Sequence, residues 1–225
     1  MKNLYVILPQ SETLVAAIAR KLTKYPYSHV TLSLDDDLEV FYSFSRLRND
    51  SPLISGFAKE YRSHLASKQG VKLKCKIFKI PITKKEYDRI NEFIKQNAND
   101  KELLFNYLSM ATLTILKGFE VHKTQNCCGF VAQALELTSK IKLDKPYYKY
   151  LPEDFDKMLS KEYLFFEGEM DTKDNYGKDD HYFDKTNFKD KLLISTYLMK
   201  ETFYRLIFKK VSKKYNPRKR ELTKW

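Results

Sequence analysis

The sequence predicts an α+β fold, in which an antiparallel sheet packs against helices. The patterns along the chain run strand, helix, hairpin, strand and then mainly helices, so the two kinds of element are partly segregated. A run of aspartates, Asp35 to Asp37, separates two segments of alternating apolar residues, which is typical of a β-hairpin. Hydrophobic residues make up 43% of the 225 residues, enough for a sizeable core in one main domain.

The first half of the chain supplies most of the expected strands. Short apolar runs and alternation every second residue indicate strands, and apolar spacing of three and four residues indicates a helix. The expected elements are a strand at 4–8, a helix from Ser11 to Leu22, hairpin strands at 30–34 and 38–44, an irregular segment at 47–70 with a short helix near Phe57, and a strand at 71–80.

The second half is mainly helical. Thr83 is expected to cap a helix through about Gln96, because Glu86 stands where the partner of a capping box belongs. The other expected elements are a helix at 102–116 that stops at Gly118, a loop at 119–125, a helix at 127–139, a short helix at 152–159, a short strand at 163–167, a polar linker at 171–190 and a last helix at 192–211.

The hairpin brings polar side chains to one face. If its turn pairs Leu34 with Leu38, then His29 lies opposite Ser43. A histidine on a strand can be oriented by a polar neighbour across the hairpin. The same face also carries Glu39, Phe41 and Ser45.

The segment NCCGFVAQAL predicts a helix with a thiol at its start. Asn126 is a plausible N-cap, because its side-chain oxygen can accept from first-turn amides. Cys127 shares a helix face with Phe130 and Val131, and the positive end of the helix dipole favours a thiolate there. A thiolate beside an imidazole is the working part of a cysteine nucleophile. The alternative is structural, because cysteine is also among the most buried residue types.

The other cysteines and histidines are weaker candidates. Cys128 is displaced from the centre of the apolar stripe, and Cys75 lies in the middle of a strand, where a structural role is expected. Three cysteines form no disulfide framework. Three histidines are expected on the solvated surface: His64, His122 and His181. We expect neither a metal nor a cofactor, because no CxxC, HxxxH or HExxH spacing occurs.

The net charge of +12 is concentrated at one end of the chain. Residues 209–225 carry eight basic residues and one acidic residue, a composition that suits an anionic membrane, an acidic partner or solvent alone. Nucleic acid is disfavoured as a partner, because no recognition motif or stacking platform accompanies the charge. The N-terminal segment lacks a secretory signal and no run is long and apolar enough to span a bilayer, which predicts a cytoplasmic protein, with peripheral membrane contact as the alternative.

Five segments in this order carry a family resemblance: YSHVTLSLD, VFYSFSR, PLISGFAKE, NCCGFVAQAL and LPEDF. Together they resemble the permuted papain-like cysteine hydrolases, a group related to NlpC-type peptidases, the YaeF and YiiX amidase-like proteins and lecithin retinol acyltransferase. In permuted members the histidine strand precedes the cysteine helix, as His29 precedes Cys127 here. The family motif C-x-x-F-V selects Cys127 over Cys128, and the SHV motif selects His29.

The resemblance implies a catalytic domain at 1–170, in which a sheet packs against the helix bearing the nucleophile. Residues 171–190 are then a polar linker, and 191–225 a C-terminal helix with a basic tail. Many family members carry a third polar residue on the strand after the histidine. Here Ser43 takes that place as a weak orienter, with Glu39 two residues nearer the turn.

The resemblance implies a cysteine-dependent amidase or peptidase that acts through a thioester on a small-molecule or peptide substrate with an amide or ester bond. A lipid acyltransferase or thioesterase of the same superfamily is the first alternative. The second is a non-catalytic module that contacts an anionic membrane through 191–225, whose last helix is apolar and followed by basic residues. Docking of that helix on the domain's own core is the plainer interpretation.

Overall fold

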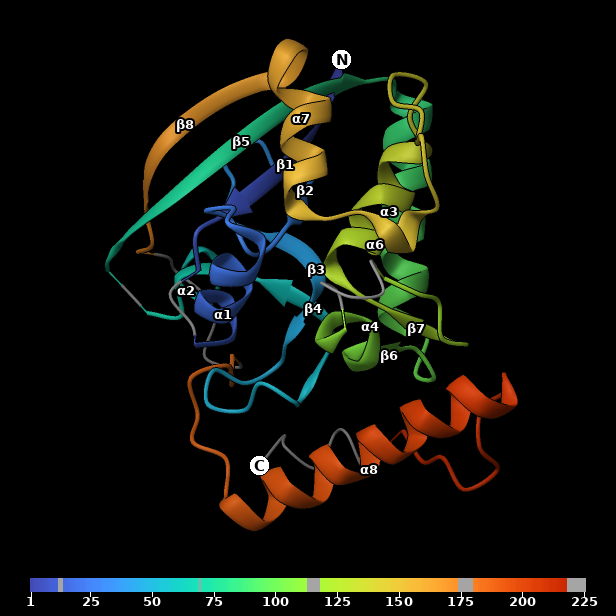
Figure 1. The fold of residues 1–225 in the computed structure, drawn as a ribbon. Helices are drawn as coiled ribbons and strands as arrows, with labels where there is room; N and C mark the ends of the chain where they lie inside the picture. The colour runs from blue at the N-terminus through green and yellow to red at the C-terminus, as the bar shows by residue number, and fades with distance from the viewer. Residues whose placement is uncertain (12–13, 69, 113–117, 174–179, 218–225) are drawn as a thin grey trace.

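The computed structural model describes residues 1–11, 14–68, 70–112, 118–173 and 180–217. It has the α+β architecture predicted, with one antiparallel sheet and helices around it (Figure 1). The six-stranded sheet has the order β4-β3-β2-β1-β5-β8. Its strands are β1 (Lys2–Pro9), β2 (Thr31–Ser33), β3 (Phe41–Arg46), β4 (Ser55–Glu60), β5 (Lys72–Ile82) and β8 (Leu164–Asp171).

The helices lie around this sheet, and a short parallel pair of strands lies beside them (Figure 1). The pair consists of β6 (Leu104–Phe105) and β7 (Thr124–Gln125). The helical elements are α1 (Leu14–Thr23), α2 (Arg62–Ala66), α3 (Lys84–Asn99), α4 (Tyr107–Ala111), α6 (Cys127–Glu136), the 3₁₀ turn η1 (Tyr147–Lys149), α7 (Pro152–Tyr163) and α8 (Phe188–Phe208).

The sheet is buried on both faces around β1, which explains the unbroken apolar run at 4–8. Leu4, Val6 and Leu8 point into the larger core, which also contains buried residues of α3, α6 and α7. Tyr5 and Ile7 point into a smaller core that α2 covers. Because successive side chains of a strand point to opposite faces, a central strand buried on both sides has no polar alternation.

Both predicted helix caps are confirmed. Thr83 and Glu86 form a reciprocal capping box at the start of α3. The Asn126 side chain accepts a hydrogen bond of 2.7 Å from the amide of Gly129, so α6 begins at Cys127 as predicted. Local sequence determines both features, because each cap satisfies orphan amides within one helical turn.

Two expected elements were wrong. Residues 55–60 form β4 rather than an irregular segment, and Phe57 lies in this strand, paired with Phe44 of β3. The helix expected at 102–116 is replaced by β6 and then α4, which starts after the N-cap Asn106. Residues 113–117 of that prediction lie outside the described residues, as do residues 12–13 of the helix expected from Ser11.

The hairpin register also differs from the prediction. Leu32 pairs with Tyr42, so the register is shifted by two residues from the expected pairing of Leu34 with Leu38. The cause is the Asp35 carboxylate, which accepts hydrogen bonds from the amides of Asp37 and Glu39 at 3.1 and 2.9 Å and widens the turn. A shift of two residues keeps the same side chains on the same face, so the polar face of the hairpin survives.

The described part of the predicted linker is packed against the domain. Tyr182 is buried and stacks on His64 with ring centroids 4.1 Å apart, while Asp180 lies 2.7 Å from His64 Nε2. His64 is therefore buried, not solvated as predicted, and its partners come from far along the chain. His181 is exposed and pairs with Asp184 at 2.7 Å. Residues 174–179 lie outside the described residues.

The last helix, α8, lies across the end of the domain formed by α4, β6 and β7 (Figure 1). Ile194 and Leu198 on its inner face belong to the larger core, which confirms that this helix docks on the domain. No helix in the described ranges has the length and apolar character needed to cross a bilayer. The end of the basic tail, residues 218–225, lies outside those ranges.

Candidate functional site

The candidate site lies where neighbouring strands of the sheet meet the start of α6. His29 lies two residues before β2, Ser43 lies on β3 and Glu60 ends β4. Cys127 is the first residue of α6, which packs on β2 and β3. The fold thus brings together the three residues predicted from the sequence, Cys127, His29 and Ser43, and adds Glu60.

Glu60 holds His29. Its Oε2 lies 3.3 Å from His29 Nε2. Ser43 donates to the same carboxylate oxygen at 2.5 Å, and Ser45 donates to Oε1 at 2.7 Å. Ser43 Oγ is also 3.3 Å from His29 Nε2. Both oxygens of a carboxylate that is only 4% exposed are therefore satisfied, and the imidazole is oriented by a charge rather than by a hydroxyl alone.

The His29–Glu60 pair is strongly polarised. Burial favours the neutral imidazole, but the charge and hydrogen bond of Glu60, together with the neighbouring Cys127, outweigh it and raise the pKa of His29 to about 10. Burial likewise opposes the ionised carboxylate, yet His29 and the two serine hydroxyls lower the pKa of Glu60 to about 2. Imidazolium and carboxylate are therefore the forms present near neutral pH.

Cys127 is the cysteine whose pKa is lowered. The hydrogen bond from Cys128 is the largest influence that lowers the pKa of Cys127; burial opposes it, and the hydrogen bond and charge of His29 and the amide of Val30 add to the lowering. The start of α6 adds the positive end of a helix dipole. Cys127 is also partly exposed, and it lines a cavity together with His29. This combination is typical of a thiolate nucleophile.

The other two cysteines have the opposite character. Cys128 Sγ lies 3.9 Å from Cys127 Sγ, and the hydrogen bond to the neighbouring sulfur and burial raise the pKa of Cys128 well above its usual value. Cys75 is fully buried within β5, and burial raises its pKa to about 12. Both are thiols in the neutral form, and Cys75 has the buried position expected of a structural residue.

Glu60 is the site residue that the sequence did not reveal. The acidic residue noted two positions nearer the turn than Ser43, Glu39, instead forms an ion pair with Arg62 at 3.2 Å. A signal for Glu60 did exist: it shares a strand face with the small residues Gly56 and Ala58, which lie directly opposite the serines of β3. Small residues beside inward-facing hydroxyls leave room for a buried carboxylate, but only once the strand pairing is known.

A cavity of about 380 Å³ opens beside His29 and Cys127. Its volume falls in the range typical of small-molecule sites. Most of its wall is apolar, with Phe44, Leu53 and Leu65 among the lining side chains. Ser28 also lines it, and its buried Oγ has no hydrogen-bond partner among the described residues.

Comparison with protein-family models, with curated proteins and with solved structures finds no match for this chain. Within the residues that the structure describes, no cluster of three or more His, Cys, Asp or Glu side chains is arranged to hold a metal ion. The function of the site is therefore inferred from its own geometry.

Proposed function

We propose that this protein is a cysteine-dependent hydrolase with a permuted papain-like fold, and that Cys127, His29 and Glu60 are its catalytic group. The observation that carries the proposal is the convergence of these groups: Cys127 and His29 line one cavity, and His29 Nε2 lies 3.3 Å from the buried carboxylate of Glu60. A nucleophile, a base and a third group that orients the base are the parts of a triad of this kind.

The chemistry follows from the charges of this group. The Cys127 thiolate attacks the carbonyl carbon of an amide or ester, and the electron pair of the carbonyl moves to its oxygen. First-turn amides of a helix lack intrahelical acceptors, so the amide at the start of α6 is suited to bind this oxyanion. The imidazolium of His29 then protonates the leaving group as the tetrahedral intermediate collapses to a thioester.

Hydrolysis of the thioester reverses these roles. His29, now neutral, takes a proton from water, and the hydroxide displaces the Cys127 thiolate, so the acid is released and the imidazolium restored. Because Glu60 occupies Nε2, the other ring nitrogen of His29, Nδ1, is left for these proton transfers. Glu60 remains a carboxylate throughout and fixes the ring.

The arrangement of the chain supports the proposed fold. The histidine segment precedes the cysteine helix in sequence, and the strand order places β2 and β3 next to the helix that starts with Cys127. Ser43, predicted as the third member of the site, becomes a supporting residue in this proposal, because it donates to the Glu60 carboxylate. The domain at 1–170 then contains the whole catalytic group.

The apolar wall of the cavity favours a second candidate, an acyltransferase or thioesterase. The bulky apolar groups Phe44, Leu53, Leu65, Phe105 and Leu151 line the space beside the thiol. Such a wall suits the hydrocarbon part of an acyl group better than a polar peptide. The same acyl-enzyme serves here, and an acceptor other than water takes the acyl group.

Labelling with an electrophile and a substrate panel test the proposal together. We expect iodoacetamide to label Cys127 in the wild type, and Cys127→Ala and His29→Ala each to lose this labelling and all turnover of amide, ester and thioester substrates. Cys128→Ala is the matched comparison: it leaves the nucleophile but removes the hydrogen bond that most lowers the pKa of Cys127, so labelling of Cys127 should persist at a reduced rate. Faster turnover of long-chain than of acetyl thioesters selects the second candidate. Full turnover by Cys127→Ala would refute both.

A further inference from the structure

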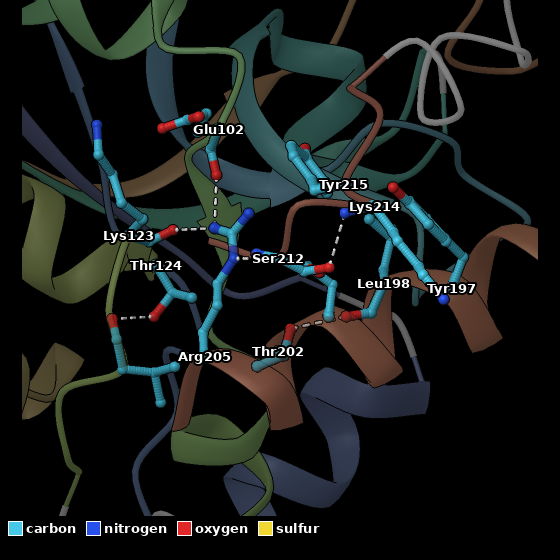
Figure 2. A network of polar contacts seen from close by, with 12 residues as sticks. Glu102, Lys123, Thr124, Tyr197, Leu198, Thr202, Arg205, Ser212, Lys214 and Tyr215 are labelled. Carbon is cyan, nitrogen blue, oxygen red and sulfur yellow. Dashed lines mark hydrogen bonds and ion pairs between the residues drawn. The ribbon is translucent and has the colours of Figure 1, made fainter. Parts of the chain in front are cut away.

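The inner face of α8 is docked on the domain. Arg205 is completely buried, and its guanidinium donates to Glu201 at 2.8 Å and to the carbonyls of Glu102 and Lys123 at 2.6 and 2.9 Å (Figure 2). Tyr215, after the helix, lies against the same guanidinium, 4.8 Å from its ring centroid. Ile194 and Leu198 lie in the core, so the domain covers this face, although Arg205 Nη2 is buried without a hydrogen-bond partner among the described residues.

The opposite face of α8 is apolar and exposed. Phe188, Leu192, Phe203 and Ile207 are 76%, 59%, 47% and 68% exposed. At a turn of 3.6 residues these side chains fall in one stripe, on the side of the helix away from Leu198 and Arg205. We call this set, with Leu206 at 38%, the outer stripe. A solvated helix would carry polar residues there, so the outer stripe is not explained by the docking of α8.

The charge around the outer stripe is mainly positive. Exposed lysines lie on the helix and in the turn that follows it, while the exposed acid of α8 is Asp190, near its start. The lysines are Lys189, Lys200, Lys209, Lys210, Lys213 and Lys214. Apolar residues with lysines around them are suited to bind a partner whose interior is hydrocarbon and whose surface is negatively charged.

We propose that α8 binds in the plane of an anionic lipid bilayer, with the outer stripe in the acyl boundary and the lysines at the headgroups. Apolar burial and attraction of the lysines to anionic lipids act together in such helices. The inner face stays on the domain, so the helix binds as part of the folded protein. This inference is independent of the proposed catalytic chemistry.

The test uses the full chain, because α8 contributes Ile194 and Leu198 to the core and its removal would disturb the fold. Co-sedimentation is measured with vesicles of phosphatidylcholine alone and of phosphatidylcholine mixed with phosphatidylserine. We expect binding to the mixed vesicles only, and weakening by salt, because the Debye length falls to about 3 Å at 1 M.

Matched variants separate the two contributions. Ile207→Ser should weaken binding at least about tenfold, since burying such a side chain contributes roughly 1.5–3 kcal/mol. Phe165→Ser is its control: Phe165 is 56% exposed but lies on β8. Lys200→Glu with Lys210→Glu should weaken binding by a similar factor, whereas Lys85→Glu with Lys95→Glu, on exposed positions of α3, should not.

Two results would overturn the inference. One is that the full chain does not bind the mixed vesicles at low salt, although its circular dichroism shows that it is folded. The other is self-association without vesicles that Ile207→Ser abolishes, because the outer stripe is then covered by a second copy of this chain. Turnover of soluble substrates should be unchanged in every variant, so failure here is distinguishable from failure of the catalytic proposal.

Discussion

Replacement of Glu60 by glutamine removes the charge behind His29 and keeps the shape of the side chain. The carboxylate lies 3.3 Å from His29 Nε2 and is buried. Without it, the imidazolium loses its counter-ion, the pKa of His29 falls, and the thiolate of Cys127 loses the cation that stabilises it. We therefore expect Glu60→Gln to raise the pKa of Cys127 and to destabilise the fold.

The size of the expected loss of stability follows from the shifted pKa of Glu60 beside His29. The pKa of Glu60 lies at about 2 instead of 4.5. At 1.36 kcal/mol per pKa unit, the site favours the charged carboxylate by roughly 3 kcal/mol. Breaking a buried ion pair by removing one partner costs about 3–5 kcal/mol, which agrees in size. We expect the free energy of unfolding of Glu60→Gln to fall by about 3 kcal/mol in urea titrations.

The assay is the alkylation of Cys127 by iodoacetamide, followed by mass spectrometry of the peptide that contains it. In the wild type the rate should be similar near pH 6.5 and near pH 9, the ordinary pKa values of histidine and cysteine. In Glu60→Gln the rate near the lower pH should fall about tenfold for each unit by which the thiol pKa exceeds that pH. Glu39→Gln is the control, because Glu39 forms only an exposed ion pair.

The reasoning is refuted if Glu60→Gln keeps the wild-type rate at the lower pH while remaining folded. It is also refuted if Glu39→Gln loses reactivity to the same extent, since Glu39 would then be the residue that sets the charge of His29. Glu60→Asp keeps the charge but shortens the side chain. If Glu60→Asp has wild-type reactivity but lower stability, the charge of residue 60, rather than its packing, governs the reactivity of the Cys127 thiol.

Three further predictions follow from the same site. The raised pKa of His29 stabilises the fold below about pH 6.5, and this contribution is lost as the pH rises towards about 10. The lowered pKa of Cys127 acts in the opposite direction: its contribution is present above about pH 9 and is lost as the pH falls. The free energy of unfolding of the wild type should therefore be nearly constant between about pH 6.5 and pH 9. Cys127→Ala removes this compensation, and its free energy of unfolding in urea should fall across that interval; a flat profile contradicts the pairing. Ser28→Ala should lower turnover several-fold without loss of melting temperature, because it deletes a buried hydroxyl that has no partner among the described residues and lines the cavity; unchanged turnover would show that Ser28 does not meet the substrate. Asn126→Ala should lower the free energy of unfolding by about 1 kcal/mol, because it removes the N-cap of α6. Asn97→Ala, near the end of α3, should lower it by less in the same urea titration.

Features that depend on a few neighbouring residues could be predicted from the sequence. The capping box of Thr83 and Glu86 and the N-cap of Asn126 each lie within one turn of helix, so their residue types suffice to indicate them. The proximity of Cys127 and His29 was predicted in a different way, from the order of motifs that resemble a known family.

Features that depend on distant pairing could not be predicted in this way. The strand β4 contains Gly56 and Ala58, which favour strands weakly, and it is held by its pairing with β3. Glu60 was missed together with its strand. His64 is buried by Asp180 and Tyr182, more than a hundred residues later, and nothing near His64 in the sequence indicates them.

The buried guanidinium of Arg205 joins two parts of the molecule that have separate proposed tasks. It donates hydrogen bonds to the carbonyls of Glu102 and Lys123. Lys123 directly precedes the strand β7, which leads through Asn126 into α6. The C-terminal helix is therefore a brace for the segment that presents the thiol. The surface proposed to contact a bilayer and the cavity beside Cys127 are therefore connected through one side chain and a few residues of backbone.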